Sequence, residues 1–414
     1  MTGIPLGPTS QTSPGTPTGL GCQRCELLDL CGGIFDAFDC LSRCCNKPDE
    51  CTLACPRSQS FAQVIQDAGG LDAARSWGIG QARNDLPAYV PHIHNGSGRS
   101  SSVPSSYVAL TTFDVVSPNA ETVFSSPDEL RQHFRISRDA HVLLLSVGKD
   151  NRLEHYWRWS VARGLAKNLA TLGVAHITAP NFSFPLDVPR PEHLVNRMRS
   201  LKCAEQLSAA GLSVIPHMNA FNQQDWDCWR DFLKDHMHIK VVAQEFQTGL
   251  ASRTRAKWHI EQLCNIQQFL GRGLHLVAVA GRRHLAILMG LTGVTVVDSV
   301  PFMRACNRRL LEKGTGKWVV RLTGRGDPID DLLCRNVTVY TRAVEKIIAT
   351  MRLTGPVAPE SRPTGADIAG ALGNAPPAVS DRQLWLWPPA AGNPHSLATP
   401  MDQEAAPVEF RAGL

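Results

Sequence analysis

From about residue 107 to residue 302, short apolar runs alternate with longer stretches of helical period. The apolar runs, each predicted to be a strand, are YVALTTF (107–113), HVLLLSVG (141–148), VAHITAPN (174–181), LSVIPHMN (212–219), IKVVAQEFQTG (239–249), LHLVAVAG (274–281) and VTVVDSVPF (294–302). Helices are expected between them, at 152–173, 191–211, about 254–270 and near 282–290. Because strands joined by helical crossovers run in the same direction, the alternation predicts an α/β fold with a parallel sheet.

Two kinds of parallel sheet are compatible with this alternation. At least five consecutive strand–helix units without antiparallel hairpin signals favour a closed (β/α) TIM-like barrel. An open doubly wound sheet is the alternative. No Gly-x-Gly-x-x-Gly follows the first predicted strand, which disfavours the nucleotide-binding form of that fold. We therefore expect a TIM-like α/β barrel over residues 107–354.

The segments outside the predicted barrel differ from it in composition. Residues 1–20 are rich in Pro, Thr, Ser and Gly, and residues 355–414 in Pro, Ala and Gly, so we expect a disordered leader and a disordered tail. The tail contains RQLWLWPP, whose aromatic residues suggest docking on a protein partner or on the body of the chain, with no role as the alternative. Residues 21–60 hold a cysteine-rich module, and residues 61–106 are expected to form a helix and a linker.

Charge and hydrophobicity restrict the location and the partners. No apolar run approaches the roughly 18 residues that a transmembrane helix needs, so no membrane contact is expected. The first residues show neither the basic region nor the apolar core of a secretory signal, and a cytoplasmic location follows as an expectation. The net charge of +5 permits anionic partners without requiring them.

Eight of the 13 cysteines lie between Cys22 and Cys55. Disulfides are disfavoured in the cytoplasm, and thiolates bind soft metals, so a metal site is the preferred interpretation. An iron–sulfur cluster, with [4Fe–4S] favoured, competes with a zinc site and with disulfides or free thiols. The expected metal ligands are Cys22, Cys25, Cys31, Cys40, Cys44, Cys51 and Cys55.

The stretch CQRCELLDLCGG (22–33) resembles the Cys-x2-Cys-x5-Cys-Gly-Gly segment of SPASM modules, which carry auxiliary iron–sulfur clusters in radical SAM enzymes. The resemblance implies that Cys22, Cys25 and Cys31 ligate a [4Fe–4S] cluster. It implies a fourth ligand from Cys40, Cys44, Cys51 or Cys55. The chain has no Cys-x3-Cys-x2-Cys motif, so the S-adenosylmethionine-binding cluster is missing and the radical reaction is not implied.

Polar residues follow the predicted strands, and in a TIM-like barrel the active site lies at the carboxyl ends of the strands. Glu245 and Asp298 each follow an apolar run, and partial desolvation there raises a carboxyl pKa toward the range useful in acid–base catalysis. We expect these two carboxylates to face one cavity as acid and base. The further catalytic candidates are His217, Asn181 and Asp150. For each residue the structural alternative is a helix cap, a turn or a surface position.

The segment 304–325 is strongly basic, and Arg304 and Arg308 are one helical turn apart. Arginine clusters bind phosphate groups, although a solvated basic face is the alternative. The predicted anion-binding residues are Lys149, Arg282, Arg304 and Arg308.

Two weaker resemblances concern the barrel segment. The stretches APNFS, NRMRS and GLSVIPH resemble phage and plasmid barrel proteins without an established activity, so they imply a fold and no mechanism. A remoter similarity is to tRNA-guanine transglycosylases, which are barrels that use strand-end carboxylates on a nucleobase. Their zinc-binding cysteine pattern downstream of the barrel is missing here.

Three functional hypotheses follow from the sequence. The preferred one is an iron–sulfur-containing barrel enzyme, such as a transferase or hydrolase that modifies a nucleobase or nucleic acid, acting on a phosphate-bearing or nucleic-acid-linked substrate. The second is a nucleic-acid-binding protein with a structural zinc module, whose binding depends steeply on salt. The third is a redox-sensing or metal-sensing regulator, in which the cluster itself is the signal.

Overall fold

The computed structural model describes residues 27–33, 46–73, 76–185, 188–247, 250, 252–324 and 326–353. All of them belong to the first of two units of the chain, Met1–Asn374. Four predicted metal ligands, Cys22, Cys25, Cys40 and Cys44, lie outside the described residues, as do the predicted leader and tail. No helix in the described ranges has both the length and the apolar character that crossing a membrane requires.

Eight strands of the described part form two four-stranded parallel sheets. The first sheet has the order β1 (Tyr89–Pro91), β8 (Gly293–Asp298), β7 (His275–Val279) and β6 (Val241–Glu245). The second has the order β2 (Tyr107–Thr111), β3 (His141–Leu145), β4 (His176–Thr178) and β5 (Val214–Ile215). The predicted α/β class with parallel strands is confirmed.

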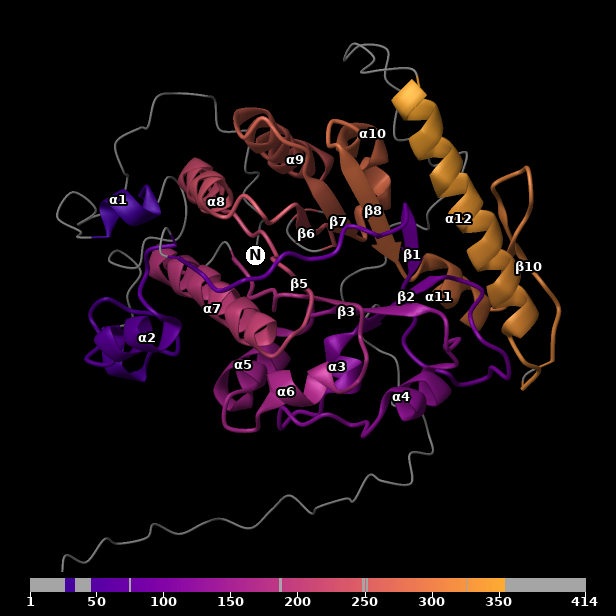
Figure 1. Ribbon diagram of the computed structural model, residues 1–414, viewed down its shortest axis with the longest axis horizontal. Helices are drawn as coiled ribbons and strands as arrows, with labels where there is room; N and C mark the ends of the chain where they lie inside the picture. The colour runs from indigo at the N-terminus through magenta and orange to yellow at the C-terminus, as the bar shows by residue number, and fades with distance from the viewer. Residues whose placement is uncertain are drawn as a thin grey trace, which may run out of the picture. The chain divides into compact units, whose positions relative to one another are not determined.

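Helices alternate with these strands along the chain and surround them in Figure 1. The helices are α1 (Leu28–Cys31), α2 (Phe61–Ala68), α3 (Thr112–Val115), α4 (Pro127–Phe134), α5 (Asp150–Trp159), α6 (Leu165–Ala170), α7 (Arg190–Ala209), α8 (Gln223–Asp235), α9 (Arg253–Phe269), α10 (Leu285–Leu288), α11 (Val300–Cys306) and α12 (Asp330–Leu353), with short 3-10 helices η2 (Pro48–Glu50) and η3 (Gly281–His284). Some of these helices begin at a residue whose side chain caps the first turn. The Asn222 side chain, for example, accepts the Asp225 amide at 3.1 Å and caps α8.

Side chains of each strand alternate between two faces, and both faces are apolar. One face, which we call the inner face, forms a single core cluster to which both sheets contribute; it includes Val90, Ala109, Leu143, Ile215, Ala243, Val277 and Val297. The other face packs against the helices and includes Val108, Leu144, Ile177, Val242 and Leu276. Burial on both sides explains why the strands are continuous apolar runs in the sequence.

The two sheets meet at both of their edges. An isolated parallel bridge pairs His92, after β1, with Ala109 in β2. A second parallel bridge pairs His217, after β5, with Ala243 in β6. The strand at each edge of one sheet therefore has a neighbour in the other sheet.

Three local expectations differ from the structure. Strand β1 lies inside the segment predicted to be a helix and linker, so the sheet begins at Tyr89 and not at residue 107. The helix predicted at 152–173 is two helices, α5 and α6, and Gly164 with φ +59° precedes the second. The helical spacing predicted for Arg304 and Arg308 is wrong. Helix α11 ends at Cys306, and Arg308 has φ +53° at the start of an antiparallel hairpin of β9 (Arg309–Leu311) and β10 (Trp318–Val320).

Candidate active site at the carboxyl ends of the strands

The inner face carries a buried histidine and a carboxylate on adjacent strands. His217 is paired with Ala243, and Glu245 lies two residues further along β6, so both side chains belong to the inner face. His217 is 1% exposed and Glu245 is 8% exposed. Neither ring nitrogen of His217 has a hydrogen-bond partner among the described residues. Burial lowers the pKa of His217 to about 3, so the ring is neutral at neutral pH.

Asp298 is held on the opposite face from Glu245. Val279 pairs with both Glu245 and Val297, which assigns these three residues to the inner face and turns Asp298 to the helix side. There its carboxylate accepts hydrogen bonds from the hydroxyls of Tyr89 at 3.2 Å and Tyr340 at 3.0 Å. Burial raises the pKa of Asp298, against the opposing charge of Arg282. The expected pair of carboxylates facing one cavity is therefore not formed by Glu245 and Asp298.

Three arginines gather after β7 and β8. Arg282 follows β7, Arg304 lies on α11 directly after β8, and Arg309 begins β9. Burial lowers the pKa of Arg304, and the positive charges of Arg309 and Arg282 lower it further, so both of these guanidinium groups lie close enough to act on Arg304. Arg282 and Arg304 are half-buried, whereas Arg309 is exposed. Two aromatic rings support the cluster: Arg282 lies 5.8 Å from the ring centre of Tyr340, and Arg304 5.6 Å from that of Trp318.

Arg308, which was also predicted to bind anions, has a structural contact. Its guanidinium donates to the carbonyl of Asp327 at 2.7 Å and ties the hairpin to the loop before α12. Arg309, which was not among the predicted anion-binding residues, joins Arg282 and Arg304 in what we call the arginine cluster.

The remaining predicted residues lie on the loops after β3, β4 and β5. Lys149 and Asp150 are exposed at the start of α5, and Asp150 accepts the Ser183 hydroxyl at 2.7 Å. Asn181 accepts a hydrogen bond from the Asn219 side chain, which also donates to the Phe182 carbonyl at 2.8 Å. These contacts hold the loops after β4 and β5 together.

Sequence reasoning missed a polar group after β1 and β2. His92 Nε2 lies 3.5 Å from Thr111 Oγ1, and His94 Nδ1 lies 3.9 Å from the Asp114 carboxylate. The rings of His92 and His94 are 4.4 Å apart at their centres. In the sequence, the apolar AYV (88–90) followed by the two histidines of PHIH (91–94) could have indicated a strand with polar side chains at its end. The Gly, Ser and Pro residues that follow indicated a loop instead.

The described cysteines of the N-terminal segment lie against the helix α7. Cys31 is 7% exposed and Cys55 is 2% exposed. The carbonyl of Cys31 accepts Arg190 Nη2 at 2.9 Å, and the Glu192 carboxylate accepts the neighbouring Ala54 amide at 2.6 Å. Arg190 and Glu192 belong to the first turn of α7, so both arms of the cysteine segment reach the same helix end. Because α7 follows β4, that end faces the carboxyl ends of the strands.

The described cysteines of this segment are soft donors, but they are not gathered around one point. The sulfur of Cys31 accepts the Gly33 amide at 3.2 Å, an interaction that stabilises a thiolate ligand. Cys51 and Cys55 supply two further soft donors. Among the described residues there is no group of three or more His, Cys, Asp and Glu side chains arranged around one point.

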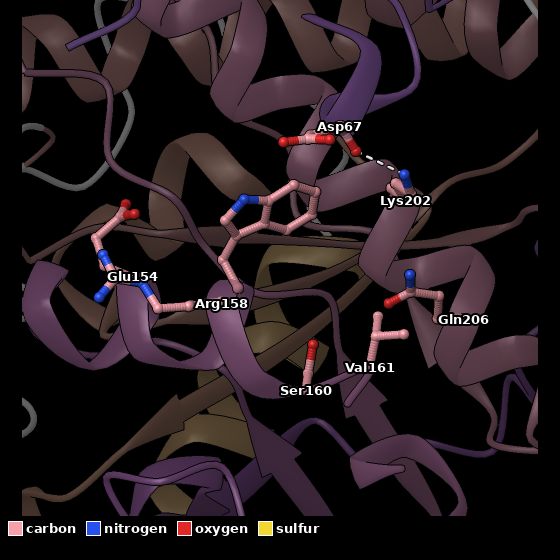
Figure 2. A pocket seen from close by; sticks show the side chains of 8 residues that line it. Asp67, Glu154, Arg158, Ser160, Val161, Lys202 and Gln206 are labelled. Atoms are coloured by element: carbon pink, nitrogen blue, oxygen red, sulfur yellow. Dashed lines mark hydrogen bonds between the residues drawn. The ribbon is translucent and has the colours of Figure 1, made fainter. Parts of the chain in front are cut away.

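A surface groove of about 420 Å³ lies apart from the strand ends, between α2, α5 and α7 (Figure 2). It is lined by Asp67, Glu154, Trp157, Arg158, Ser160, Val161, Lys202 and Gln206. Lys202 Nζ donates to the Asp67 carbonyl at 2.6 Å and joins α2 to α7 across it. The groove contains both charge signs and none of the predicted site residues.

Comparison with known proteins adds no family to these observations. No protein-family model matches the chain, and the search of curated proteins finds no match.

Proposed function

We propose that the chain is a TIM-like α/β-barrel enzyme that acts on a phosphate-bearing or nucleic-acid-linked substrate at the carboxyl ends of its strands, with a thiolate metal centre in the cysteine segment. The observation that carries the proposal is the cluster of Arg282, Arg304 and Arg309 after β7 and β8. Arg304 is half-buried and lies in the positive field of Arg282 and Arg309, and an anion bound beside these guanidinium groups would stabilise it.

Strand register supports a closed barrel. The register of each strand pair can be extended along the strands and followed once around, from His92 through β2, β3, β4, β5, β6, β7 and β8. The path returns to the first strand at position 84, eight residues before His92. A stagger of about eight residues over eight parallel strands is the geometry of TIM barrels. In such barrels the loops after the seventh and eighth strands are a frequent phosphate-binding site. The arginine cluster occupies the corresponding loops.

The inner face offers the acid–base residues of the proposed site. Glu245 is a buried carboxylate that accepts the Gln247 amide, and the buried, neutral His217 ring has no hydrogen-bond partner at either nitrogen among the described residues. We assign the proton transfers to this pair. Asp298, bound by two tyrosine hydroxyls and facing Arg282, orients the arginine cluster.

The metal centre is proposed on the chemistry of its donors. Cys31, Cys51 and Cys55 are the described members of the ligand set, and Cys22, Cys25, Cys40 and Cys44 complete it in the sequence. A [4Fe–4S] cluster, or zinc as the alternative, would fix the cysteine segment over the strand ends, and the cluster would in addition exchange electrons.

Anion binding tests the proposal. Isothermal titration of the full chain with inorganic phosphate and with AMP is expected to show binding that Arg304→Gln weakens by about 10-fold or more, since a charge-assisted hydrogen bond contributes about 1.5–3 kcal/mol. Arg335→Gln, which removes an exposed arginine of α12, is the control and leaves binding unchanged. Equal affinity of the Arg304 variant and the wild type contradicts the proposal.

Metal analysis after anaerobic purification tests the second part. Iron with acid-labile sulfide and a broad visible absorption band supports the cluster, and zinc alone supports the nucleic-acid-binding alternative. Steep salt dependence of RNA binding without turnover of any phosphate ester would further favour that alternative.

A further inference from the structure

A serine, a histidine and an aspartate form a hydrogen-bonded chain at the amino ends of β4 and β5, the end of the strands opposite to the proposed site. His176 is the first residue of β4, and Ser213 directly precedes β5. Ser213 Oγ lies 3.0 Å from His176 Nδ1, and a carboxylate oxygen of Asp85, from the segment before β1, lies 3.0 Å from Nε2 of the same ring. We call these residues the Ser213–His176–Asp85 triad.

Strand register places the serine beside the histidine. Thr178 pairs with Ile215, so the residues two positions earlier, His176 and Ser213, are also neighbours. Ile215 belongs to the inner face, and side chains two positions apart in a strand share a face. The ring of Tyr107 stacks on that of His176, with 6.1 Å between their centres, and holds its plane. The orientation of the triad is therefore set by paired strands.

The charge of Asp85 determines which nitrogen of His176 carries the hydrogen. Burial opposes the ionised form of Asp85, but its hydrogen bonds and its interaction with His176 lower its pKa. An ionised carboxylate only accepts hydrogen bonds, so Nε2 is the donor. Burial lowers the pKa of His176 against the opposing effect of Asp85, so the ring is neutral and Nδ1 has a free lone pair. The Ser213 hydroxyl donates to this lone pair, which makes the histidine its base.

Arg83 supplies two further features of the site. Its backbone amide donates to Ser213 Oγ at 3.3 Å and so turns the hydroxyl hydrogen toward the histidine. Its exposed guanidinium donates to the carbonyl of Ala175 at 3.4 Å, and its charge acts on His176. Ser213 itself is partly exposed, whereas His176 is fully buried. A reagent can therefore reach the serine, and a cation lies near it to stabilise negative charge.

A cavity of about 300 Å³ lies at the same end of the strands. It includes Asn84, which is between Arg83 and Asp85 in the chain. The parallel bridge after β5 places Lys240, another lining residue, beside the residue that follows Ser213. The aliphatic part of the lining consists of Leu86, Leu274, Val294 and Ile348. A cavity of this size and character accepts a short apolar acyl chain.

We propose that the Ser213–His176–Asp85 triad is a second catalytic site, which hydrolyses carboxylic esters with a short acyl chain. Ser213 Oγ attacks the carbonyl carbon while its proton passes to His176 Nδ1, the bond to the alcohol breaks, and His176 gives the proton to the departing alcohol. Water then attacks the acyl-serine in the same way and releases the carboxylic acid. Asp85 stabilises the imidazolium, and Arg83 stabilises the negative carbonyl oxygen.

A fluorophosphonate probe tests the serine directly, because an activated serine displaces fluoride from it and keeps a stable phosphonyl ester. Mass spectrometry of the labelled full chain is expected to locate the probe on Ser213, and a chain unfolded in urea should take up none. Ser213→Ala should lose the label and lower kcat/KM for para-nitrophenyl acetate about 100-fold or more. Ser208→Ala is the matched control and should keep both, since that hydroxyl accepts the Gly80 amide of the same segment at 2.7 Å.

Asp85→Asn separates positioning from packing. The side chain is 45% exposed and asparagine has its shape, so the fold should be retained. We expect kcat and the labelling rate to fall about 100-fold with KM little changed, whereas a merely structural contact would alter only the melting temperature. Wild-type chain without label at Ser213 overturns the proposal, and wild-type labelling of Asp85→Asn overturns the role of the aspartate. Arg304→Gln should label normally, so failure of the proposed phosphate site is a separate result.

Discussion

The substitution Asp225→Asn tests the electrostatic description of the interior most directly. Asparagine has the same shape and keeps an oxygen that can accept the Phe221 amide, now 2.8 Å from the carboxylate. What disappears is the negative charge between the guanidinium groups of Arg190 and Arg197, whose side chains are each 1% exposed. Removing one partner of a fully buried ion pair costs about 3–5 kcal/mol, because the other charge stays buried without compensation.

The size of the effect can be measured by urea unfolding of the full chain, followed by far-ultraviolet circular dichroism. With a slope of about 3 kcal/mol per M, the midpoint is expected to fall by about 1–1.7 M. Asp231→Asn is the matched control, since it makes the same change on the same helix in a carboxylate that is 51% exposed and paired with Arg230. It should shift the midpoint by less than about 0.3 M.

The pH dependence of the free energy of unfolding provides a second test of the Asp225→Asn variant. The folded-state pKa of Asp225 lies below the ordinary aspartate value of 3.8, so its charge stabilises the fold fully above that value and loses its effect as pH falls through the lowered pKa. The difference in stability between wild type and Asp225→Asn should therefore be constant from about pH 5 to 8 and should narrow only in strong acid. A midpoint shift no larger than that of Asp231→Asn would refute the assignment of Asp225 as the neutralising charge.

Three further predictions concern local packing, capping and thiol reactivity. A Cβ atom at Gly96 would lie 2.0 Å from the His133 carbonyl oxygen, so Gly96→Ala should destabilise the fold by about 1–3 kcal/mol in thermal unfolding, whereas Ser97→Ala should not. Ser126→Ala removes the side-chain cap of α4, which accepts the Glu129 amide at 3.2 Å, and should cost about 1 kcal/mol in the same assay. Cys334 is exposed, whereas burial raises the pKa of Cys203 to about 12; Cys334→Ser should therefore remove one fast-reacting thiol in titration with a disulfide reagent, and Cys203→Ser should remove none.

Local periodicity was sufficient to predict the strands from β2 to β8 and the helices α7 and α9, whereas α3 and α4, between β2 and β3, were not expected. Strands buried on both faces are continuous apolar runs, and this property is readable in the sequence of β3, β6 and β7 without any tertiary contact. The position of Glu245 and Asp298 at strand ends was predictable for the same reason. Strand β1 was not, because three residues in a Pro-rich segment form a strand only by pairing with β8, about 200 positions away.

The pairing register of the strands determines on which side of the sheet each strand-end side chain lies. Glu245 and Asp298 have the same sequence context, an apolar run followed by a turn, yet the pairing of β6, β7 and β8 turns one to the inner face and the other toward α12. A shift of one residue would exchange the two roles. The same dependence explains why Arg309 and not Arg308 joins Arg282 and Arg304. The backbone at Arg308 turns to φ +53°, so helical spacing does not apply there.

The sequence by itself determined the class of fold and the places along the chain where polar groups interrupt apolar strands, because both depend on neighbours within a few residues. Tertiary structure alone decided what those groups face. Helix α7 illustrates the difference: Arg190, His193, Asn196, Arg197 and Arg199 are polar side chains that its sequence would assign to solvent, and all five are buried. Their partners come from distant segments: Arg190 contacts Cys31 and Asp225, Arg197 contacts Asp225, and Arg199 contacts Glu154. The free energy of a buried charge depends on such partners, which no local pattern contains.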